Sequence, residues 1–403
     1  GLKMTTTKNN EHKKLNAPNL RFPEFEGEWE EVGLSELLDF KNGLNPKPDK
    51  FGKGIKFISV MDILNNAVIT YDCIKASVDV TEKELSDFSV EKGDMLFQRS
   101  SETLEDVGRA NVYMDDKTAV FGGFVIRGKK KGEYDPQYFN YLLRSPFARK
   151  RIIPMGAGAQ HFNIGQEGLS KVKLHFANIE EQKKIGKMLS LLDERIATQN
   201  KVIEDLKKLK CAIIEKVYSE IQGKEYSYGQ LFDVVNERNK QMEYSNILSA
   251  SQEKGMVNRD DLNLDIQFER SNINTYKIVK KGDYVIHLRS FQGGFAFSDK
   301  LGVCSPAYTI LRPNNLLEYG YLSNYFTSQR FIKSLIIVTY GIRDGRSINV
   351  DEWLSMKITI PSKEHQQYIV KVIGSFERKI EKEEAYATQL SIQKQYLLRQ
   401  MFI

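Results

Sequence analysis

The sequence lacks the features that would place it in a membrane or outside the cell. No apolar run approaches the ~18 residues of a membrane-spanning helix, and the first residues show no apolar signal-peptide core. The three cysteines, Cys73, Cys211 and Cys304, are an odd number without the CxxC spacing of a zinc site. We therefore expect a soluble, cytoplasmic chain with reduced thiols.

Sequence signatures of catalysis are also missing. There is no Pro-Pro or Pro-Cys pair of the kind found in the active sites of adenine or cytosine methyltransferases, and no Gly-Lys-Ser/Thr phosphate cradle of a translocase. The histidines are scattered without the spacing of metal ligands, so we expect no metal site; they are His12, His161, His175, His287 and His365. We predict that this chain binds rather than catalyses, and that it holds no cofactor of its own.

A long internal repeat is the main positive signal. Residues 179–185 (IEEQKKI) and residues 363–369 (KEHQQYI) open two similar stretches 184 positions apart, as Ile185 and Ile369 show. Val90 to Asp94, followed by Arg99-Ser100, likewise matches Val279 to Asp283, followed by Arg289-Ser290. A period this long in 403 residues predicts two domain-sized copies rather than a solenoid.

Each copy begins with short alternating apolar runs broken by Gly, Asp and Asn, which predict short strands and turns. Helical patterns occur at residues 137–150 and 321–334, so both globular parts are predicted to be α+β. The two Lys-Gly-Asp motifs, residues 92–94 and 281–283, precede predicted strands. We interpret them as turns rather than as catalytic carboxylates.

Each copy ends in a predicted long helix with apolar residues at alternating spacings of four and three, the seam of a coiled coil. A helix of roughly 36 residues would be about 54 Å long, too long for the core of one such domain. The seam consists of Ile185, Leu189, Leu192, Ile196, Ile203, Leu206, Ile213, Val217, Ile369, Ile373, Phe376, Ile380, Leu390, Leu397 and Met401.

The polar interruptions of the seam recur as well: Gln199 with Glu383, and Lys210 with Lys394. Because polar seam residues select register and partner, we predict that the two helices pair with each other, antiparallel and pseudo-two-fold symmetric. The alternative is that they pair between two molecules. The predicted segments are a disordered lead-in at 1–19, a first domain at 20–178, a helix at 179–222, a second domain at 223–361 and a helix at 362–403.

Two diverged domains on a fixed spacer suit a ligand with two unlike features, such as duplex DNA, whose half-sites on one face lie about 34–36 Å apart. The mild basic excess, a net charge of +6 and a pI ≈ 8.8, permits such contact. Arg, Asn and Gln suit base edges and Lys suits phosphate. Candidates in the loops that differ between copies are Lys41, Asn42, Arg99, Arg109, Lys129, Lys130, Lys131, Gln160, His161, Asn163, Arg289, Gln292, Arg343 and Arg346.

Several of these motifs together resemble the specificity subunit of type I restriction-modification systems. The motifs are residues 20–23 (LRFP), residues 25–29 (FEGEW), the Glu-x-Gln openings at 180–182 and 364–366, and the Lys-Gly-Asp turns. One departure is Phe176-Ala177 where the second copy has Ile360-Pro361. The resemblance implies that each domain is a target recognition domain reading half of a bipartite asymmetric DNA site, and that the helices pair antiparallel as spacers.

The resemblance also implies the partners: two methyltransferase subunits with S-adenosylmethionine, which methylate adenine N6, and restriction subunits that use ATP and magnesium for translocation. None of that chemistry would lie in this chain. Two other interpretations remain open. One is a coiled-coil adaptor that binds proteins and no DNA, and the other is a stand-alone nuclease or methyltransferase, which the missing motifs disfavour.

Overall fold

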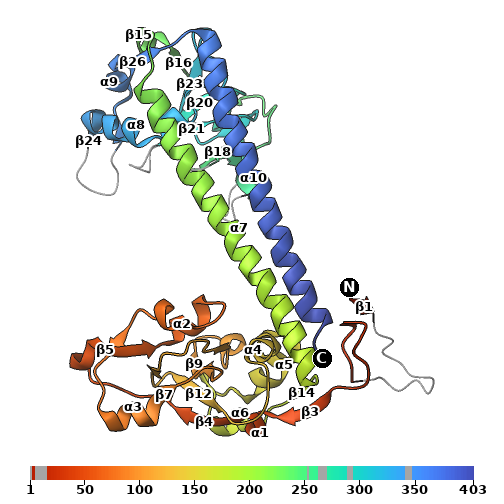
Figure 1. Cartoon of the computed structure of the whole chain (residues 1–403). Coiled ribbons are helices and arrows are strands. Elements are labelled where there is room, and N and C mark those ends of the chain that lie inside the picture. The colour runs from red at the N-terminus through yellow and green to blue at the C-terminus, as the bar shows by residue number, and fades with distance from the viewer. Residues whose placement is uncertain (1, 5–15, 252–253, 262–269, 288–293, 341–346) are drawn as a thin grey trace. The chain divides into compact units, whose positions relative to one another are not determined.

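The structure, a computed structural model, describes residues 2–4, 16–251, 254–261, 270–287, 294–340 and 347–403. Contacts between Cα atoms divide the chain into two compact units, residues 1–200 with 385–403 and residues 201–384. The long helices α7 (Ile179–Ser219) and α10 (Lys363–Gln400) each contribute to both units (Figure 1). Each unit therefore contains one globular domain and a segment of both helices.

The first domain contains two four-stranded sheets. One is antiparallel in the order β10-β8-β12-β4, and the other has the order β6-β5-β11-β7, in which β11 and β5 are parallel. The strands of these sheets are β4 (Leu38–Asn42), β5 (Phe51–Ile58), β6 (Ser77–Val78), β7 (Ser89–Val90), β8 (Met95–Gln98), β10 (Ala110–Val112), β11 (Ala119–Phe121) and β12 (Val125–Lys130).

Two-stranded pairs complete the sheet structure of this domain: β1 (Lys3–Met4) with β2 (Leu20–Arg21), β3 (Glu30–Gly33) with β14 (Lys173–Phe176), and β9 (Ser100–Ser101) with β13 (Phe162–Asn163). The α-helices are α1 (Leu34–Leu37), α2 (Val60–Asn65), α3 (Glu82–Phe88), α4 (Pro136–Arg144), α5 (Pro146–Ile152) and α6 (Gln166–Ser170).

The helix predicted at 137–150 is two helices. Ser145 ends α4 and caps α5, because its hydroxyl accepts a hydrogen bond from the backbone N of Ala148 at 3.2 Å and Pro146 occupies the first helical position. The main core of the first domain includes Ile185 from α7 and Leu397 near the end of α10. Both long helices therefore contribute apolar side chains to this core.

The second domain repeats the main sheet, with antiparallel order β16-β23-β20-β21, and carries its own core around Trp353 and Phe326. The strands of this domain are β15 (Lys224–Ser227), β16 (Phe232–Val235), β17 (Leu248–Ser251), β18 (Gly255–Asn258), β19 (Lys277–Val279), β20 (Tyr284–Ile286), β21 (Phe295–Phe297), β22 (Gly302–Cys304), β23 (Thr309–Pro313), β24 (Thr339–Tyr340), β25 (Ser347–Ile348) and β26 (Lys357–Ile360).

The helices of the second domain are α8 (Gln329–Ser334) and α9 (Val350–Ser355). The helix predicted at 321–334 is shorter than expected, because Ser328 caps α8 through its hydroxyl, as Ser145 caps α5. Tyr218 of α7 and Ile369 of α10 lie in the core of this domain. Both long helices therefore contribute apolar side chains to the core of each domain.

Both Lys-Gly-Asp motifs are turns, as predicted. Gly93 and Gly282 adopt φ of +95° and +94°, which an L side chain rarely tolerates. The Asp94 carboxylate accepts a hydrogen bond from the backbone N of Glu91 at 3.0 Å, and the Asp283 carboxylate accepts one from the backbone N of Lys280 at 2.8 Å. Burial raises the pKa of Asp94, against the effect of the hydrogen bonds that its carboxylate accepts from the backbone N of Glu91 and of Lys130. Both carboxylates act in stabilising a turn.

The two long helices pair antiparallel within each unit. In the first unit Asp193 pairs with Lys394 at 2.5 Å, and the Arg195 guanidinium lies 5.5 Å from the ring centroid of Tyr386. In the second unit Lys207 pairs with Glu384 at 2.7 Å and Lys210 with Glu377 at 3.0 Å. Partner numbers in α10 fall as those in α7 rise, so the helices run in opposite directions (Figure 1).

The seam lysines are satisfied in equivalent ways. Lys210 and Lys394 are repeat-related, and so are their partners Glu377 and Asp193. Each lysine thus pairs with the acidic residue of the other copy. The apolar residues predicted for the seam are buried or half-buried throughout, including Met401, which lies just beyond α10.

Part of the predicted disordered lead-in is ordered. Strand β1 pairs with β2, and the Lys3 ammonium donates to the carbonyl of Pro23 at 2.8 Å. Ala17 is buried, and the carbonyl of Asn16 accepts a hydrogen bond from the backbone N of Trp29 at 2.7 Å. These contacts bring residues 2–4 and 16–19 into the first domain, so the prediction of disorder over 1–19 is wrong for them.

The two seam ion pairs should differ in their contribution to stability. The Asp193 side chain is 14% exposed and also accepts a hydrogen bond from the Tyr141 hydroxyl at 2.7 Å, whereas Glu377 is 41% exposed. We expect Asp193→Ala to lower the free energy of unfolding of the first unit by about 1.5–3 kcal/mol, and Glu377→Ala to lower that of the second by about 0–1 kcal/mol.

Urea unfolding measured by tryptophan fluorescence checks this expectation. The chain has two tryptophans, Trp29 in the first unit and Trp353 in the second. A Trp353→Phe background therefore reports on the first unit, and a Trp29→Phe background on the second. Equal losses for the two alanine variants would contradict the prediction.

Candidate functional site

Four chain segments meet at one edge of the first domain. The backbone N of Ile164 donates to the carbonyl of Arg99 at 2.9 Å, and the backbone N of Arg99 donates to that of Phe124 at the same distance. The Ser100 hydroxyl donates to the Asn163 side-chain oxygen. A Cβ added to Gly123 would lie 1.9 Å from the Asn45 side chain, so Asn45 lies directly beside this turn. We call Asn45, Arg99, Ser100, Phe124, His161 and Asn163 the first-domain edge.

The first-domain edge brings together several predicted DNA-binding residues. Gln160 and His161 are exposed in the segment before β13, next to Asn163. Arg109 is close, because the backbone N of Gln98 donates to its carbonyl at 2.7 Å. Asn45, Ser100 and Phe124 were not among the binding residues predicted from the sequence. The Gly122-Gly123 pair after an apolar strand was the signal that could have revealed this turn.

Two arginines lie beside this edge, together with acidic residues. The Arg109 guanidinium pairs with Asp106 at 2.5 Å and its side chain remains 53% exposed. Burial, and secondarily the nearby Arg109 cation, lower the pKa of Arg149 to about 10. Arg149 stays largely protonated at neutral pH and donates to the carbonyls of Glu105 and Val107. Arg109 is thus paired with a carboxylate, and Arg149 is held by backbone carbonyls.

The amide of Gln98 lies directly under the edge. Its nitrogen donates to the carbonyl of Ser100 at 2.9 Å, but its buried oxygen has no hydrogen-bond partner among the described residues. The equivalent position in the second domain, four residues after Asp283, holds His287, whose Nε2 also lacks a partner there. Burial lowers the pKa of His287. Incompletely paired polar side chains thus occur at the same strand position in both domains.

The remaining lysine candidates lie away from the edge. Lys129, Lys130 and Lys131 are at the opposite end of β12 from Phe124. Lys129 pairs with Glu91 at 3.6 Å, Lys131 pairs with Asp39 at 3.1 Å, and the Lys130 ammonium donates to the carbonyl of Tyr134 at 3.1 Å. Exposed pairs of this kind contribute little stability, so the lysines can exchange partners.

Lys41 and Asn42 lie on β4. The Lys41 ammonium pairs with Asp87 at 3.1 Å and lies 4.9 Å from the ring centroid of Phe88. Asn42 is half-buried at the end of the strand, and its side-chain oxygen has no partner among the described residues. The second-domain candidates fall outside the described residues; they are Arg289, Gln292, Arg343 and Arg346.

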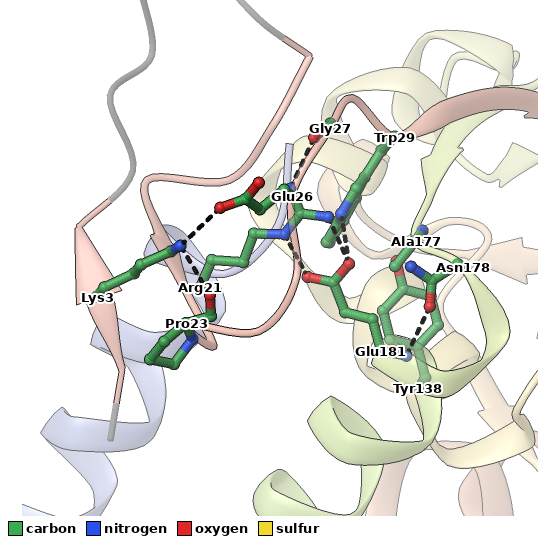
Figure 2. Close-up of polar contacts among 10 residues, drawn as sticks. All are labelled: Lys3, Arg21, Pro23, Glu26, Gly27, Trp29, Tyr138, Ala177, Asn178 and Glu181. Atoms are coloured by element: carbon green, nitrogen blue, oxygen red, sulfur yellow. Dashed lines mark hydrogen bonds and ion pairs between the residues drawn. The ribbon is translucent and has the colours of Figure 1, made fainter.

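A second polar cluster joins the N-terminal segment to the start of α7 (Figure 2). The buried Arg21 guanidinium binds both carboxylate oxygens of the buried Glu181 at 2.7 Å each, and it donates to the carbonyl of Gly27 at the same distance. The Trp29 indole N–H donates to the same carboxylate at 3.3 Å. A bidentate pair of this kind sets the orientation of both side chains.

Glutamates around this cluster make it unsuitable for DNA phosphate. A cavity of ≈ 340 Å³ beside Arg21 is lined by Glu26, Glu28, Glu30 and Glu133, and the one guanidinium is already neutralised by Glu181. Negative charge of this density repels a phosphate. We interpret the cluster as the structural connection between the N-terminal segment, the first domain and α7.

A buried glutamine fixes the start of both long helices. The Gln182 amide donates to the carbonyl of Ala177 at 2.7 Å and accepts from the backbone N of Asp135 at 3.0 Å. The Gln366 amide donates to the carbonyl of Pro361 at 3.0 Å and accepts from the backbone N of Glu318 at 2.7 Å. The two junctions are therefore alike despite the Ala177 and Pro361 difference.

Within the described parts of the chain, no helix is long and apolar enough to cross a membrane. The same residues contain no group of three or more His, Cys, Asp or Glu side chains that could hold a metal ion.

A family model described as the type I restriction modification DNA specificity domain matches residues 26–208 and again residues 223–390. A Methanocaldococcus jannaschii protein assigned as the type I restriction enzyme MjaX specificity subunit is 24% identical over 92% of each chain. The Escherichia coli type I restriction enzyme EcoKI specificity subunit is 25% identical over 34% of this chain and 28% of its own.

Two solved structures have the same fold. The type I restriction-modification S subunit from M. genitalium superposes with a TM-score of 0.56 at 16% identity, covering 96% of this chain and 99% of the other. A chain from a study of complex assembly and conformational transition of the type I R-M system gives a TM-score of 0.57 at 14% identity, covering 92% and 96%. Both are alike in fold over nearly the whole chain.

The Arg21 and Glu181 pair yields a stability prediction. We expect Arg21→Met to lower the free energy of unfolding of the first unit by about 3–5 kcal/mol, because it leaves the Glu181 carboxylate buried without its cation. Adding Glu181→Gln should recover much of this loss, since a neutral amide still offers an acceptor to Trp29. Urea unfolding in the Trp353→Phe background measures both effects.

The control is Lys171→Met, which removes one member of an exposed pair with Glu167 on the same domain. We expect no measurable change for this variant. If the double variant proved no more stable than Arg21→Met alone, the uncompensated charge would not be the cause of the loss.

Proposed function

Because this chain belongs to the type I restriction-modification DNA specificity family, we propose that it reads a bipartite, asymmetric duplex DNA site with one domain for each half-site. In this proposal domains 20–178 and 223–361 are the target recognition domains. The helical segments 179–222 and 362–403 act as the spacer. The chain itself is non-catalytic and supplies sequence recognition to a larger enzyme.

The observation that carries the proposal is the duplication. The two domains share the order of the main sheet, the Lys-Gly-Asp turn and the glutamine at the helix start. They differ in the loops: the turn after β11 carries Gly122, Gly123 and Phe124, whereas the turn before β23 carries Pro306 and Ala307. A common frame with unlike loops suits an asymmetric ligand.

The proposed partners follow from family membership. We propose that two methyltransferase subunits carrying S-adenosylmethionine bind this chain, and that restriction subunits using ATP and magnesium join the complex. The assembly would act in the cytoplasm, where its DNA substrate lies. The alternative, a coiled-coil adaptor without DNA recognition, is not favoured, because the family match covers both globular domains as well as the helices.

Mapping N6-methyladenine in cells tests the proposal. We expect cells that carry the methyltransferase partner together with this chain to show methylated adenines at one split sequence motif, and cells with the partner alone to show none. Replacing residues 20–178 with the first domain of a relative should change one half of the motif and leave the other. Methylation at the same motif in the absence of this chain would contradict the proposal.

Arg109 offers a test of how bases are read at the first-domain edge. If the Arg109 guanidinium binds a guanine edge, Arg109→Lys keeps the positive charge but loses the bidentate hydrogen bonds to the base. We then expect affinity for random duplex to be kept, and discrimination at one base pair to fall by about 1–3 kcal/mol. Fluorescence anisotropy on single-substitution duplexes measures this.

Arg109→Ala and Asp106→Asn are the companion variants. Arg109→Ala should also reduce the number of counterions released on DNA binding by about one, which weakens the salt dependence of the affinity. Asp106→Asn removes the present partner of Arg109 and should strengthen DNA binding. Unchanged discrimination in Arg109→Lys would assign this side chain to a phosphate instead.

A further inference from the structure

Phe124 is an apolar side chain that the fold leaves in solvent. Its side chain is 69% exposed, and among the described residues no other phenylalanine, tyrosine or tryptophan is more exposed. Full burial of such a ring would stabilise the fold, and most of that stabilisation is not realised here. The ring therefore adds little to the core of the first domain.

The backbone around Phe124 is held rigidly. The backbone N of Val125 donates to the carbonyl of Gly122 at 2.9 Å, and the Arg99 guanidinium donates to that of Gly123 at 3.3 Å. A Cβ at Gly122 would lie 2.6 Å from the Phe57 ring, so this approach requires glycine. The turn presents Phe124 from a fixed backbone, which limits the conformational entropy lost when the ring binds a partner.

The neighbours of Phe124 match the chemistry of nucleic acid. The backbone N of Arg99, which precedes Ser100, donates to the carbonyl of Phe124, and Asn45 lies beside Gly123. Arg109 adds an exposed cation close to the same edge. An aromatic ring on an edge that carries arginine and amide side chains suits bases flanked by phosphates better than it suits an apolar protein surface.

We propose that Phe124 is a specificity-determining residue whose ring stacks on a base of the duplex half-site bound by the first domain, loosening the adjacent base step. Apolar side chains inserted at a base step partly unstack it, and this is easiest at flexible steps. Phe124 would thus favour half-sites with a deformable step, in addition to direct reading by Arg109 and its neighbours. The inference rests on the function proposed above.

Among the described residues of the second domain, the position equivalent to Phe124 holds no aromatic ring. In the first domain, Val125 of β12 pairs with Gln98. In the second domain, Thr309 of β23 pairs with Ile286, and the next residue, His287, is the equivalent of Gln98. Continuing this register sets Tyr308 opposite His287 and makes exposed Ala307 the counterpart of Phe124. The stacking proposed for Phe124 therefore concerns the half-site bound by the first domain.

The test uses the complex of the full chain with its methyltransferase partner and a duplex carrying the mapped site. For Phe124→Ala we expect an affinity about 10-fold weaker for the specific duplex, with unchanged affinity for random duplex. The fluorescence of a 2-aminopurine placed in the first-domain half-site should increase when the wild-type complex binds, because the base step is loosened. That rise should be absent in Phe124→Ala and present in Phe124→Trp.

The matched control is Phe51→Ala. Phe51 belongs to the same domain and is 43% exposed. It lies seven residues along β5 from Ile58, the residue of that strand that pairs with Phe121. Phe51→Ala should leave affinity and 2-aminopurine signal unchanged. The inference is overturned if Phe124→Ala binds like the wild type, if Phe51→Ala weakens binding equally, or if Phe124→Ala prevents assembly with the partner subunit.

Failure of the wider function is distinguishable from failure of this inference. If the wild-type complex showed no salt-dependent DNA binding, the recognition function itself would be wrong. If the complex bound DNA and increased the fluorescence of 2-aminopurine equally with and without the Phe124 ring, the recognition function would stand and the proposed stacking of Phe124 would be wrong.

Discussion

The structure depends on one requirement: two long amphipathic helices must have their apolar faces covered along their whole length. Each unit meets this requirement by holding a segment of both helices. The first-domain core takes Ile185 from the start of α7 and Leu397 near the end of α10, and the second takes Tyr218 and Ile369. The long helices thus belong to the domain cores as well as to each other, which makes pairing and domain folding interdependent.

The sequence predicted this framework well because its signals are periodic or local. Heptad spacing revealed the seam, and repetition of Lys210 and Lys394 revealed that the partners are equivalent. The Lys-Gly-Asp turns were predictable because a glycine before a buried aspartate fixes a local conformation. Residue pattern and short-range geometry were sufficient for these features.

Contacts between distant segments that belong to no repeated pattern were not predictable. Arg21 and Glu181 are 160 positions apart, and nothing in either local sequence indicates that they form a buried bidentate pair. The helix predicted at 137–150 is divided because Ser145 competes for the backbone as a cap, a choice that periodicity does not reveal. The exposure of Phe124 depends on how Gly122 and Gly123 pack against Phe57 and Asn45. Such features require the three-dimensional arrangement of the chain.

The exchange of seam charges has a consequence for the origin of the chain. Asp193 and Lys210 on α7 have the same relation as Glu377 and Lys394 on α10, and each lysine binds the acid of the opposite helix. A single helix of this type carries both halves of its own interface, so two identical copies would satisfy each other in an isologous dimer. Fusion of two such copies into one gene would have kept the contact intact and freed each globular half to diverge.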